Sequence, residues 1–88
     1  MTENEIIERC RQQDAKAQRF LYERHAPKML GVCRRYISSK EDAEDVLVEA
    51  MFKVFDNINA FQSAGSFAGW IRRIVVNEAL MLLRKKRL

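Results

Sequence analysis

The chain has 88 residues, a net charge of +4 at neutral pH and a hydrophobic fraction of 48%. This length fits one domain, and three Gly with one Pro are too few for a disordered linker or a turn-rich all-β fold. No apolar run approaches the roughly 18 residues of a membrane span. Residues 1–5 are acidic and lack the apolar core of a signal peptide. We therefore expect a cytoplasmic protein without membrane insertion.

The chain has few side chains that could form disulfides, bind a metal ion or act as a catalytic nucleophile. Cys10, Cys33 and the single His25 are too few for a disulfide scaffold or a four-ligand zinc site. Free cysteines are most often buried, so we interpret both as reduced core thiols. The sequence also lacks glycine-rich phosphate-binding motifs and the nucleophile elbow. These observations predict a protein that is not an enzyme and has no metal or cofactor.

Charge is divided unevenly along the chain. Residues 1–37 carry 8 basic and 5 acidic side chains, residues 38–57 carry 2 and 6, and residues 58–88 carry 6 and 1. The three segments therefore hold net charges of +3, −4 and +5. An acidic middle followed by a basic end suggests two different partners for one small domain.

Capping residues mark the first two helices. Thr2 and Glu5 form a capping box for a short helix that ends near Gln13. Asp14 is the N-cap candidate of a long helix over about residues 15–37. The apolar residues at helical spacing are Ile6, Ile7 and Cys10 in the first helix, and Ala17, Phe20, Leu21, Met29, Leu30, Cys33 and Ile37 in the second.

Pro27 lies inside the second helical pattern. A proline in a helix interior lacks the amide hydrogen, and its ring clashes with the carbonyl four residues earlier. We therefore expect either two helical pieces or one bent helix, with the change of direction near Ala26.

The clearest helical period in the chain runs from Ser39 to about Asp56, with Ser39 and Asp42 marking its start. Its inward positions hold Ala43, Val46, Leu47, Ala50, Met51, Val54, Phe55 and Ile58. Residues 57–66 break the pattern and predict a loop. Ser66 is the N-cap candidate of a last helix over about residues 67–86.

The inner face of this last helix is expected to hold Phe67, Trp70, Ile71, Ile74, Val75, Met81 and Leu82. Glu78 falls on the same face, and because an unpaired buried carboxylate is costly, we expect it to meet an Arg or to lie at the rim.

Together these segments predict an all-α fold, a compact bundle of about four helices around one core. The residues expected in that core are Leu21, Leu30, Leu47, Ala50, Met51, Val54, Phe67, Ile74 and Met81. The connection over residues 57–66 is longer than the three- or four-residue turn of a helix-turn-helix, which argues against a duplex-binding repressor.

Val48 and Phe52 fall on the outer face of the third helix, among the acidic residues Asp45, Glu49 and Asp56. Exposed apolar side chains in an acidic frame lower solubility unless something covers them. Either another helix of this domain packs there, or the patch docks a basic partner with an apolar centre and a charged rim. Carboxylates are poor internal packing partners, so the sequence favours docking.

The last helix carries an outward stripe of Arg73, Asn77, Leu80 and Arg84, followed by more basic residues up to position 87. Arg and Asn side chains hydrogen-bond phosphates and base edges, and helix propensity does not explain an exposed mid-helix Asn. An ordinary solvated basic face is the alternative, and the basic run favours a polyanion.

The loop at residues 61–66 combines an aromatic with small residues, which suits an unstacked base. This signal is weak by itself, because loops are commonly rich in Ser and Gly. Phe61, Phe67 and Trp70 fit better as core aromatics that anchor the loop.

Several of these motifs resemble a known family when taken in order. They are Asp42-Ala-Glu-Asp-Val-Leu-Val-Glu49, Phe52-Lys-Val-Phe55, Phe61, and Gly65-Ser-Phe-Ala-Gly-Trp-Ile-Arg-Arg-Ile-Val-Val-Asn77. The run is similar to region 2 of sigma-70 factors of the extracytoplasmic-function (ECF) group, which are bacterial initiation factors for RNA polymerase. The resemblance covers about residues 6–87. It implies a sigma factor region 2 domain over residues 1–88, cut from a longer protein because region 4 does not follow.

The resemblance implies two binding surfaces. The family segment that docks on the β′ clamp helices of core RNA polymerase matches Asp42, Asp45, Val48, Glu49 and Phe52, although the family usually has Gln where this chain has Val48. The family segment that captures a flipped base of the promoter −10 element and holds its melted non-template strand matches Phe61, Ser63, Ala64, Gly65, Arg73, Asn77, Leu80 and Arg84. An anti-sigma factor is a further candidate partner.

The implied function is transcription initiation, by binding core polymerase and by recognising and melting the −10 element. A helical protein-interaction module without DNA binding, such as an adaptor or a sigma mimic, remains the alternative. Salt separates the two, because affinity for a DNA strand falls steeply as salt rises.

Overall fold

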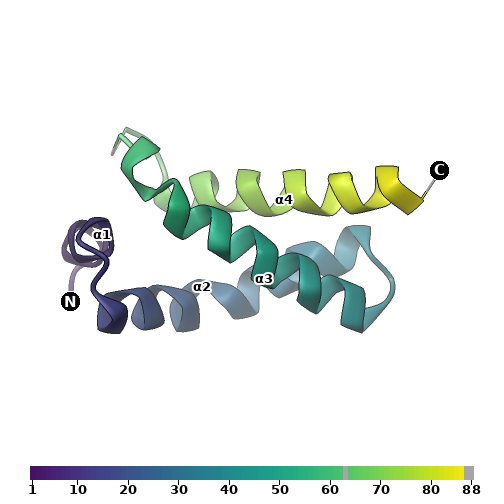
Figure 1. Cartoon of the computed structure of the whole chain (residues 1–88), viewed down its shortest axis with the longest axis horizontal. Helices are drawn as coiled ribbons and strands as arrows, with labels where there is room; N and C mark the ends of the chain where they lie inside the picture. Colours follow the sequence, from purple (N-terminus) through teal and green to yellow (C-terminus); the bar gives the residue numbers. More distant parts are fainter. Residues whose placement is uncertain (63, 87–88) are drawn as a thin grey trace.

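The computed structural model describes residues 1–62 and 64–86. The described residues form α1 (Glu3–Arg11), α2 (Ala15–Tyr36), α3 (Lys40–Asp56), the short 3-10 helix η1 (Ile58–Ala60) and α4 (Phe67–Lys86), shown in Figure 1. There is no strand among them, and none of these helices is both long and apolar enough to cross a bilayer. The predicted all-α architecture of four helices is confirmed.

The domain is elongated and measures 41 × 21 × 19 Å, with α2, α3 and α4 as its main body. Each of these three helices contacts the other two, and α1 packs on α2 and η1. Figure 1 shows α1 end-on, so α1 runs across the long axis of the body. The start of α1 and the end of α4 lie at opposite ends of that axis (Figure 1).

The helix starts are those that the capping residues predict. The side chains that accept a backbone N–H two or three residues later belong to Thr2, Asp14, Ser39 and Ser66. The helix α1 ends at Arg11, and Gln13 then adopts a φ of 59°. This left-handed residue lies where the sequence predicts the end of the first helix.

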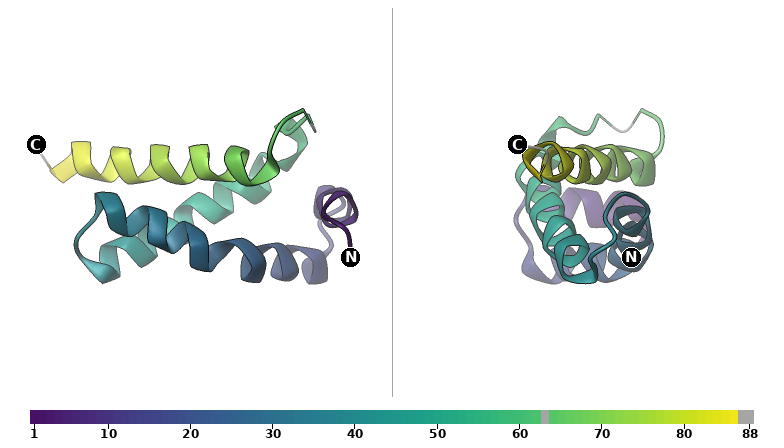
Figure 2. Two further views of the ribbon diagram at one scale, coloured as in Figure 1. Left: turned by 180° about the vertical axis from the view of Figure 1, so that it is seen from behind. Right: turned by 90° about the vertical axis from the view of Figure 1, so that its right-hand side faces the viewer.

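The helix α2 continues through Pro27 as a single helix. Of the two outcomes expected there, the bent helix is correct, because its axis changes direction about halfway along in the left view of Figure 2. The lost amide hydrogen and the ring clash account for such a bend.

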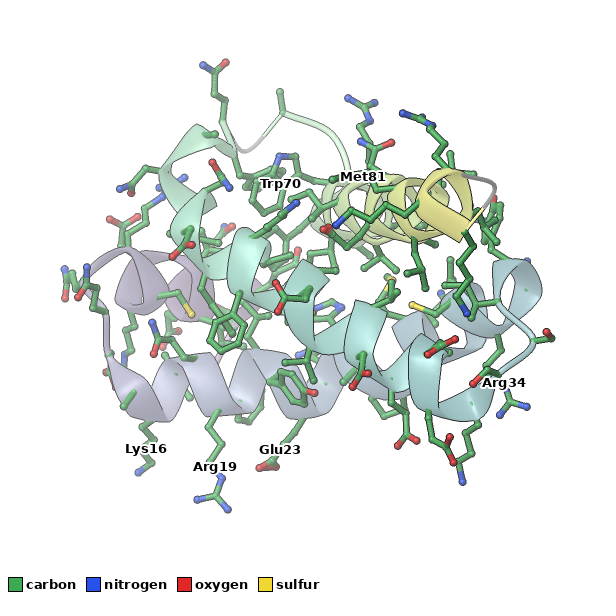
Figure 3. The ribbon with its side chains drawn as sticks, turned by 45° about the vertical axis from the view of Figure 1, so that its right-hand side comes forward. Lys16, Arg19, Glu23, Arg34, Trp70 and Met81 are labelled. Carbon is green, nitrogen blue, oxygen red and sulfur yellow. The ribbon has the colours of Figure 1, made fainter. Side chains whose placement is uncertain are left out.

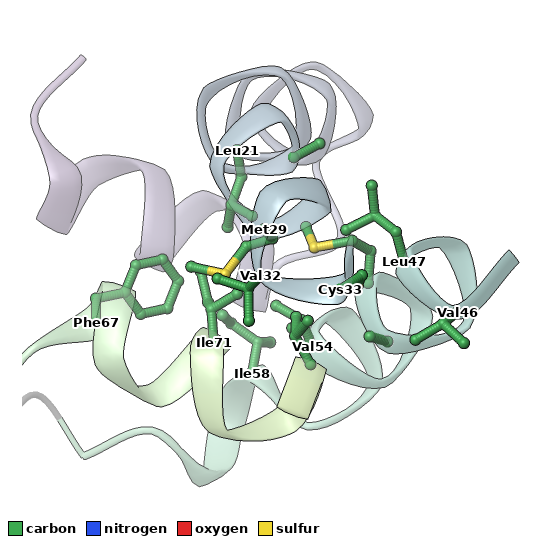
Figure 4. Packing of buried hydrophobic residues seen from close by; sticks show 14 of the residues in the cluster. Leu21, Met29, Val32, Cys33, Val46, Leu47, Val54, Ile58, Phe67 and Ile71 are labelled. Atoms are coloured by element: carbon green, nitrogen blue, oxygen red, sulfur yellow. The ribbon is translucent and has the colours of Figure 1, made fainter. Parts of the chain in front are cut away.

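One apolar cluster with residues from all five helices forms the core (Figure 4). Leu21, Met29 and Met51 are among its fully buried side chains, and burying a side chain of this size contributes roughly 1.5–3 kcal/mol. The inward positions predicted for α3 are buried, except for the half-buried Phe55. Leu30 and Ile74 are also only half-buried, against the edge of the core.

Two residues expected to face inward do not. Phe20 is 41% exposed and Met81, expected in the core, is 44% exposed. The buried face of α4 contains Val75 and Ala79; at about 100° per residue, Met81 lies on the other side of the helix from Ala79. Similarly, Leu21 occupies the core position in α2, which turns the preceding Phe20 toward solvent.

Candidate functional site

The outer face of α3 carries Asp42, Asp45, Val48, Glu49 and Phe52, here called the α3 surface, and all of these residues except Asp42 are exposed. Val48 is 42% exposed and Phe52 is 61% exposed. Within the part of the chain that the structure describes, no helix covers these two side chains. The predicted exposure is therefore confirmed, and the interpretation that another helix of the domain packs there is wrong.

Asp42 differs from the rest of the α3 surface because it is half-buried. Its carboxylate accepts a hydrogen bond from the Lys86 ammonium at the end of α4. Beside this ion pair, four carboxylate residues line a hollow of about 270 Å³ between α3 and α4, namely Asp42, Asp45, Glu49 and Glu78. Negative charge is thus concentrated at the edge of α3, and it meets the basic end of α4 at this contact.

Glu78 faces α3 and finds a lysine rather than the expected arginine. The Lys53 ammonium lies 2.7 Å from one carboxylate oxygen of Glu78. The side chain of Glu78 is 11% exposed, whereas that of Lys53 is 45% exposed. The ion pair therefore compensates a mostly buried carboxylate at the junction of α3 and α4.

The predicted stripe on α4 lies opposite the buried face of that helix. Arg73, Asn77 and Arg84 are exposed, and Leu80 is half-buried. Asn77 is two residues beyond the fully buried Val75, so it points to the far side of the helix. The α4 stripe, made of these four predicted residues, is therefore available to a partner along most of its length.

The loop before α4 is anchored by an aromatic cluster. Phe61 is 6% exposed, and its ring centroid lies 5.0 Å from that of Phe67 and 5.6 Å from that of Trp70. The Phe61 carbonyl accepts a hydrogen bond from Arg11 Nη2 at 2.6 Å. These contacts support the interpretation of Phe61 as a core aromatic, and its buried ring is not presented to a ligand in this conformation.

The described loop residues after Phe61 are exposed, and all of them except Gln62 are small. Ala64 and Gly65 are exposed, and Gly65 has a φ of +89°, which side chains rarely adopt. Ser63, the remaining loop residue predicted to bind DNA, lies outside the described residues. The glycine at position 65 is therefore explained by the turn that leads into α4.

Asn77 and Trp70 meet in one hollow beside η1. This hollow of about 370 Å³ is also lined by Ala60, Lys53 and Met81. Trp70 is half-buried, and Figure 3 shows Trp70 and Met81 on the α4 side of the domain. The structure thus brings the α4 stripe next to an aromatic ring that the sequence placed only in the core.

Burial shifts the pKa of three titratable side chains that lie in or beside the core. Burial raises the pKa of the Cys10 and Cys33 thiols, both of which lie in the core. Burial also lowers the pKa of His25, whose ring meets Phe67 edge-on at 5.7 Å. Among the described residues, no group of three or more His, Cys, Asp or Glu is arranged to hold a metal ion.

Known proteins resemble this chain in sequence and in structure. Residues 21–88 match the family described as Sigma-70 region 2. Over 79 residues, the chain is 35% identical to the ECF RNA polymerase sigma-E factor of Haemophilus influenzae and 33% identical to that of Escherichia coli (strain K12). Each match covers 90% of this chain and 41% of the relative, so the chain spans less than half the length of these proteins.

A solved structure agrees along the whole chain. It is the NMR structure of the complex formed by an engineered region 2 of sigmaE with GTAAAA, and the alignment covers 100% of this chain and 94% of that one. The TM-score is 0.86 at 31% sequence identity. From the family match, the curated relatives and this structural agreement, we conclude that the chain belongs to the sigma-70 region 2 family.

Proposed function

We propose that this chain is the region 2 domain of an ECF sigma factor, which binds core RNA polymerase and single-stranded promoter DNA of the −10 element. The observation that carries the proposal is the presence of two exposed surfaces of opposite character. The α3 surface is acidic with Phe52 at its centre, and the α4 stripe presents Arg73 and Asn77 beside the loop. Neither surface holds a catalytic group, so the domain works by binding.

The α3 surface suits the β′ clamp helices of the polymerase. Phe52 exposes most of its ring and Val48 lies beside it, one helical turn away. An aromatic centre supplies most of the affinity in such interfaces, while rim charges such as Asp45 and Glu49 set orientation and association rate. Val48, in place of the usual Gln of the family, adds apolar area at this centre in place of a hydrogen bond.

The α4 stripe suits a melted DNA strand. A sigmaE region 2 with a closely similar fold binds GTAAAA, which supports the same ligand class here. Asn77 can hydrogen-bond a base edge, and in the hollow beside η1 it lies next to Trp70, on which a base can stack. Arg73 is exposed on the same stripe and meets phosphates. Capturing unstacked bases offsets part of the few kcal/mol that each unstacked step costs.

Titration of the chain with the single strand GTAAAA at two salt concentrations tests the DNA part of the proposal. Arg73→Ala should weaken binding of all strands alike and flatten the salt slope by about 0.7, because one phosphate contact is lost. Asn77→Ala should leave the salt slope unchanged and alter base preference by about 1–3 kcal/mol. Lys16→Ala, at an exposed cation that points away from α4 in Figure 3, is the control and should change neither.

Two outcomes contradict the proposal at different levels. An unchanged base preference in Asn77→Ala refutes the role of that residue. If the strand binds neither to this chain nor to its complex with core polymerase, the domain is a protein-interaction module that uses the α3 surface alone. On the proposed function the domain acts in the cytoplasm, and an anti-sigma factor that covers either surface is a further candidate partner.

A further inference from the structure

The acidic edge of α3 and the basic end of α4 lie on the same side of the domain. Asp45 and Glu49 border the hollow of about 270 Å³ between α3 and α4, and Lys85 borders it as well. Asp42, which lines the same hollow, forms its ion pair with Lys86 there. Charges of both signs are therefore neighbours on one side, here called the α3–α4 face, which is the α3 surface together with Lys85 and Lys86.

Most charges of the α3–α4 face have no partner within the described part of the domain. Across residues 1–62 and 64–86, none of Asp45, Glu49 and Lys85 takes part in an ion pair. All three side chains belong to exposed residues. Asp42 and Lys86 are the paired residues of this face, and their contact shows that cations at the end of α4 reach the carboxylates of α3.

The α3–α4 face also exposes apolar surface. Val48 and Phe52 are exposed on the outer side of α3, and Val46 and Leu82 line the hollow between α3 and α4. Apolar side chains inside a charged rim are typical of protein interfaces. Ion pairs at a protein surface contribute little by themselves, so burial of this apolar surface supplies the favourable free energy of a contact.

A face that carries both charges side by side is complementary to a copy of itself. When two such faces meet across a two-fold axis, the acidic edge of each copy lies against the basic end of the other, and every contact forms twice. The net charge of +4 on each chain opposes the approach of two copies. Association through this face therefore depends on the local order of the charges and not on the net charge.

We propose that two copies of this chain associate through their α3–α4 faces. Lys85 of each copy contacts Asp45 and Glu49 of the other, and its alkyl stem covers part of the Phe52 ring. One helix face and one helix end bury less than the roughly 800 Å² per partner of a standard interface, so the dimer is weak and dissociates readily. The dimer covers the α3 surface, so on the proposed function it competes with core polymerase.

Sedimentation equilibrium of the chain at two salt concentrations tests the dimer. At about 0.1 M salt, charges are screened beyond about 10 Å, which weakens the repulsion between whole domains and leaves contacts at ion-pair distance. The average mass should then rise from 10.4 kDa toward twice that value as the chain is concentrated. At about 1 M salt the screening length falls to about 3 Å, and the dissociation constant should be about tenfold higher.

Charge reversal identifies the residues in contact. Glu49→Lys and Lys85→Glu should each raise the dissociation constant at least about tenfold, because like charges then meet across the interface. An equimolar mixture of the two variants should dimerise again, since position 49 of each copy then faces an opposite charge at position 85 of the other. Glu23→Lys and Lys16→Glu change the net charge by the same amounts at side chains that point away from α4 in Figure 3, and these matched controls should dimerise normally. Circular dichroism checks that every variant is folded.

Three other outcomes contradict the inference. A mass of 10.4 kDa at every concentration up to about 1 mM excludes the dimer, because even a contact of millimolar dissociation constant would be detected. A dimer that is equally tight at both salt concentrations is not held by paired charges. A dimer that persists in Glu49→Lys or Lys85→Glu, or a mixture of the two that stays monomeric, refutes the pairing of these faces. The proposed function stands in each case, because its tests use single-stranded DNA and a β′ peptide.

Discussion

Truncation of Phe52 to Ala separates binding from folding. A Phe→Ala change in a core costs about 3–5 kcal/mol, including the cavity that it leaves. Phe52 is 61% exposed, so its removal leaves no closed cavity and unpacks less than half of a ring. We expect a cost of about 1 kcal/mol or less, which lowers Tm by at most about 4–8 °C in a domain of this size.

The effect of Phe52→Ala on binding should be larger than its effect on stability. As the central aromatic of the α3 surface, Phe52 should contribute about 1–3 kcal/mol to binding a β′ clamp-helix peptide. Isothermal calorimetry measures this loss, and thermal unfolding followed by circular dichroism measures the stability. Phe67→Ala is the matched control, because Phe67 is 3% exposed and its truncation should lower Tm by more than about 12 °C.

Two results would refute the reasoning on Phe52. If Phe52→Ala destabilises the domain as much as Phe67→Ala does, the ring is part of the core and the α3 surface is misplaced. If neither stability nor peptide affinity changes, the polymerase binds elsewhere on the domain.

Three further predictions concern buried charge and titratable groups. Lys53→Ala leaves the mostly buried Glu78 unpaired and should lower the free energy of unfolding in urea by about 1–3 kcal/mol. Lys53→Arg keeps a cation beside Glu78 and should retain most of this stability. Burial lowers the pKa of His25 in the folded domain, so protonation favours the unfolded chain and stability should fall as pH drops below about 6.5; His25→Gln should flatten this dependence. Burial raises the pKa of Cys10 and Cys33, so a thiol reagent at pH 8 should react with them slowly until urea opens the domain.

Features that depend on neighbours in the sequence could be predicted without the structure. Each N-cap, such as Ser39 with the Asp42 amide, forms within one helical turn. The period of α3 is also local, and because two of its faces differ so clearly, it identified both the buried Leu47 and the exposed Phe52. The exposure of the α3 surface was therefore predictable from the sequence.

Features that depend on how helices cross could not be predicted in the same way. On α4 the small Ala79 is buried, whereas the large apolar Met81 is exposed. A helical pattern that counts only large apolar side chains therefore selects Met81 for the core and overlooks Ala79. The ion-pair partner of Glu78 is Lys53, which lies 25 residues away in the sequence. The pair forms only because α3 packs against α4, so the sequence alone does not reveal it.

The α3–α4 face was missed for the same reason. Lys85 joins Asp45 and Glu49 only after α4 packs beside α3. The charges of −4 on residues 38–57 and +5 on residues 58–88 were the available signal, and they do not say which of these side chains meet on one side of the domain.

The hydrogen bond from Arg11 to the Phe61 carbonyl connects residues 50 positions apart. On the proposed function, this bond lowers the conformational entropy that the loop loses when DNA binds. It fixes the start of the loop, while the Ser66 cap fixes the other end at α4. A loop held at both ends has less freedom to lose when a strand binds, so more of the contact energy remains as affinity. On the proposed function, α1 thus preorganises a DNA-binding loop although it lies outside the α4 stripe. Arg11→Ala should weaken strand binding without removing any group that touches the strand.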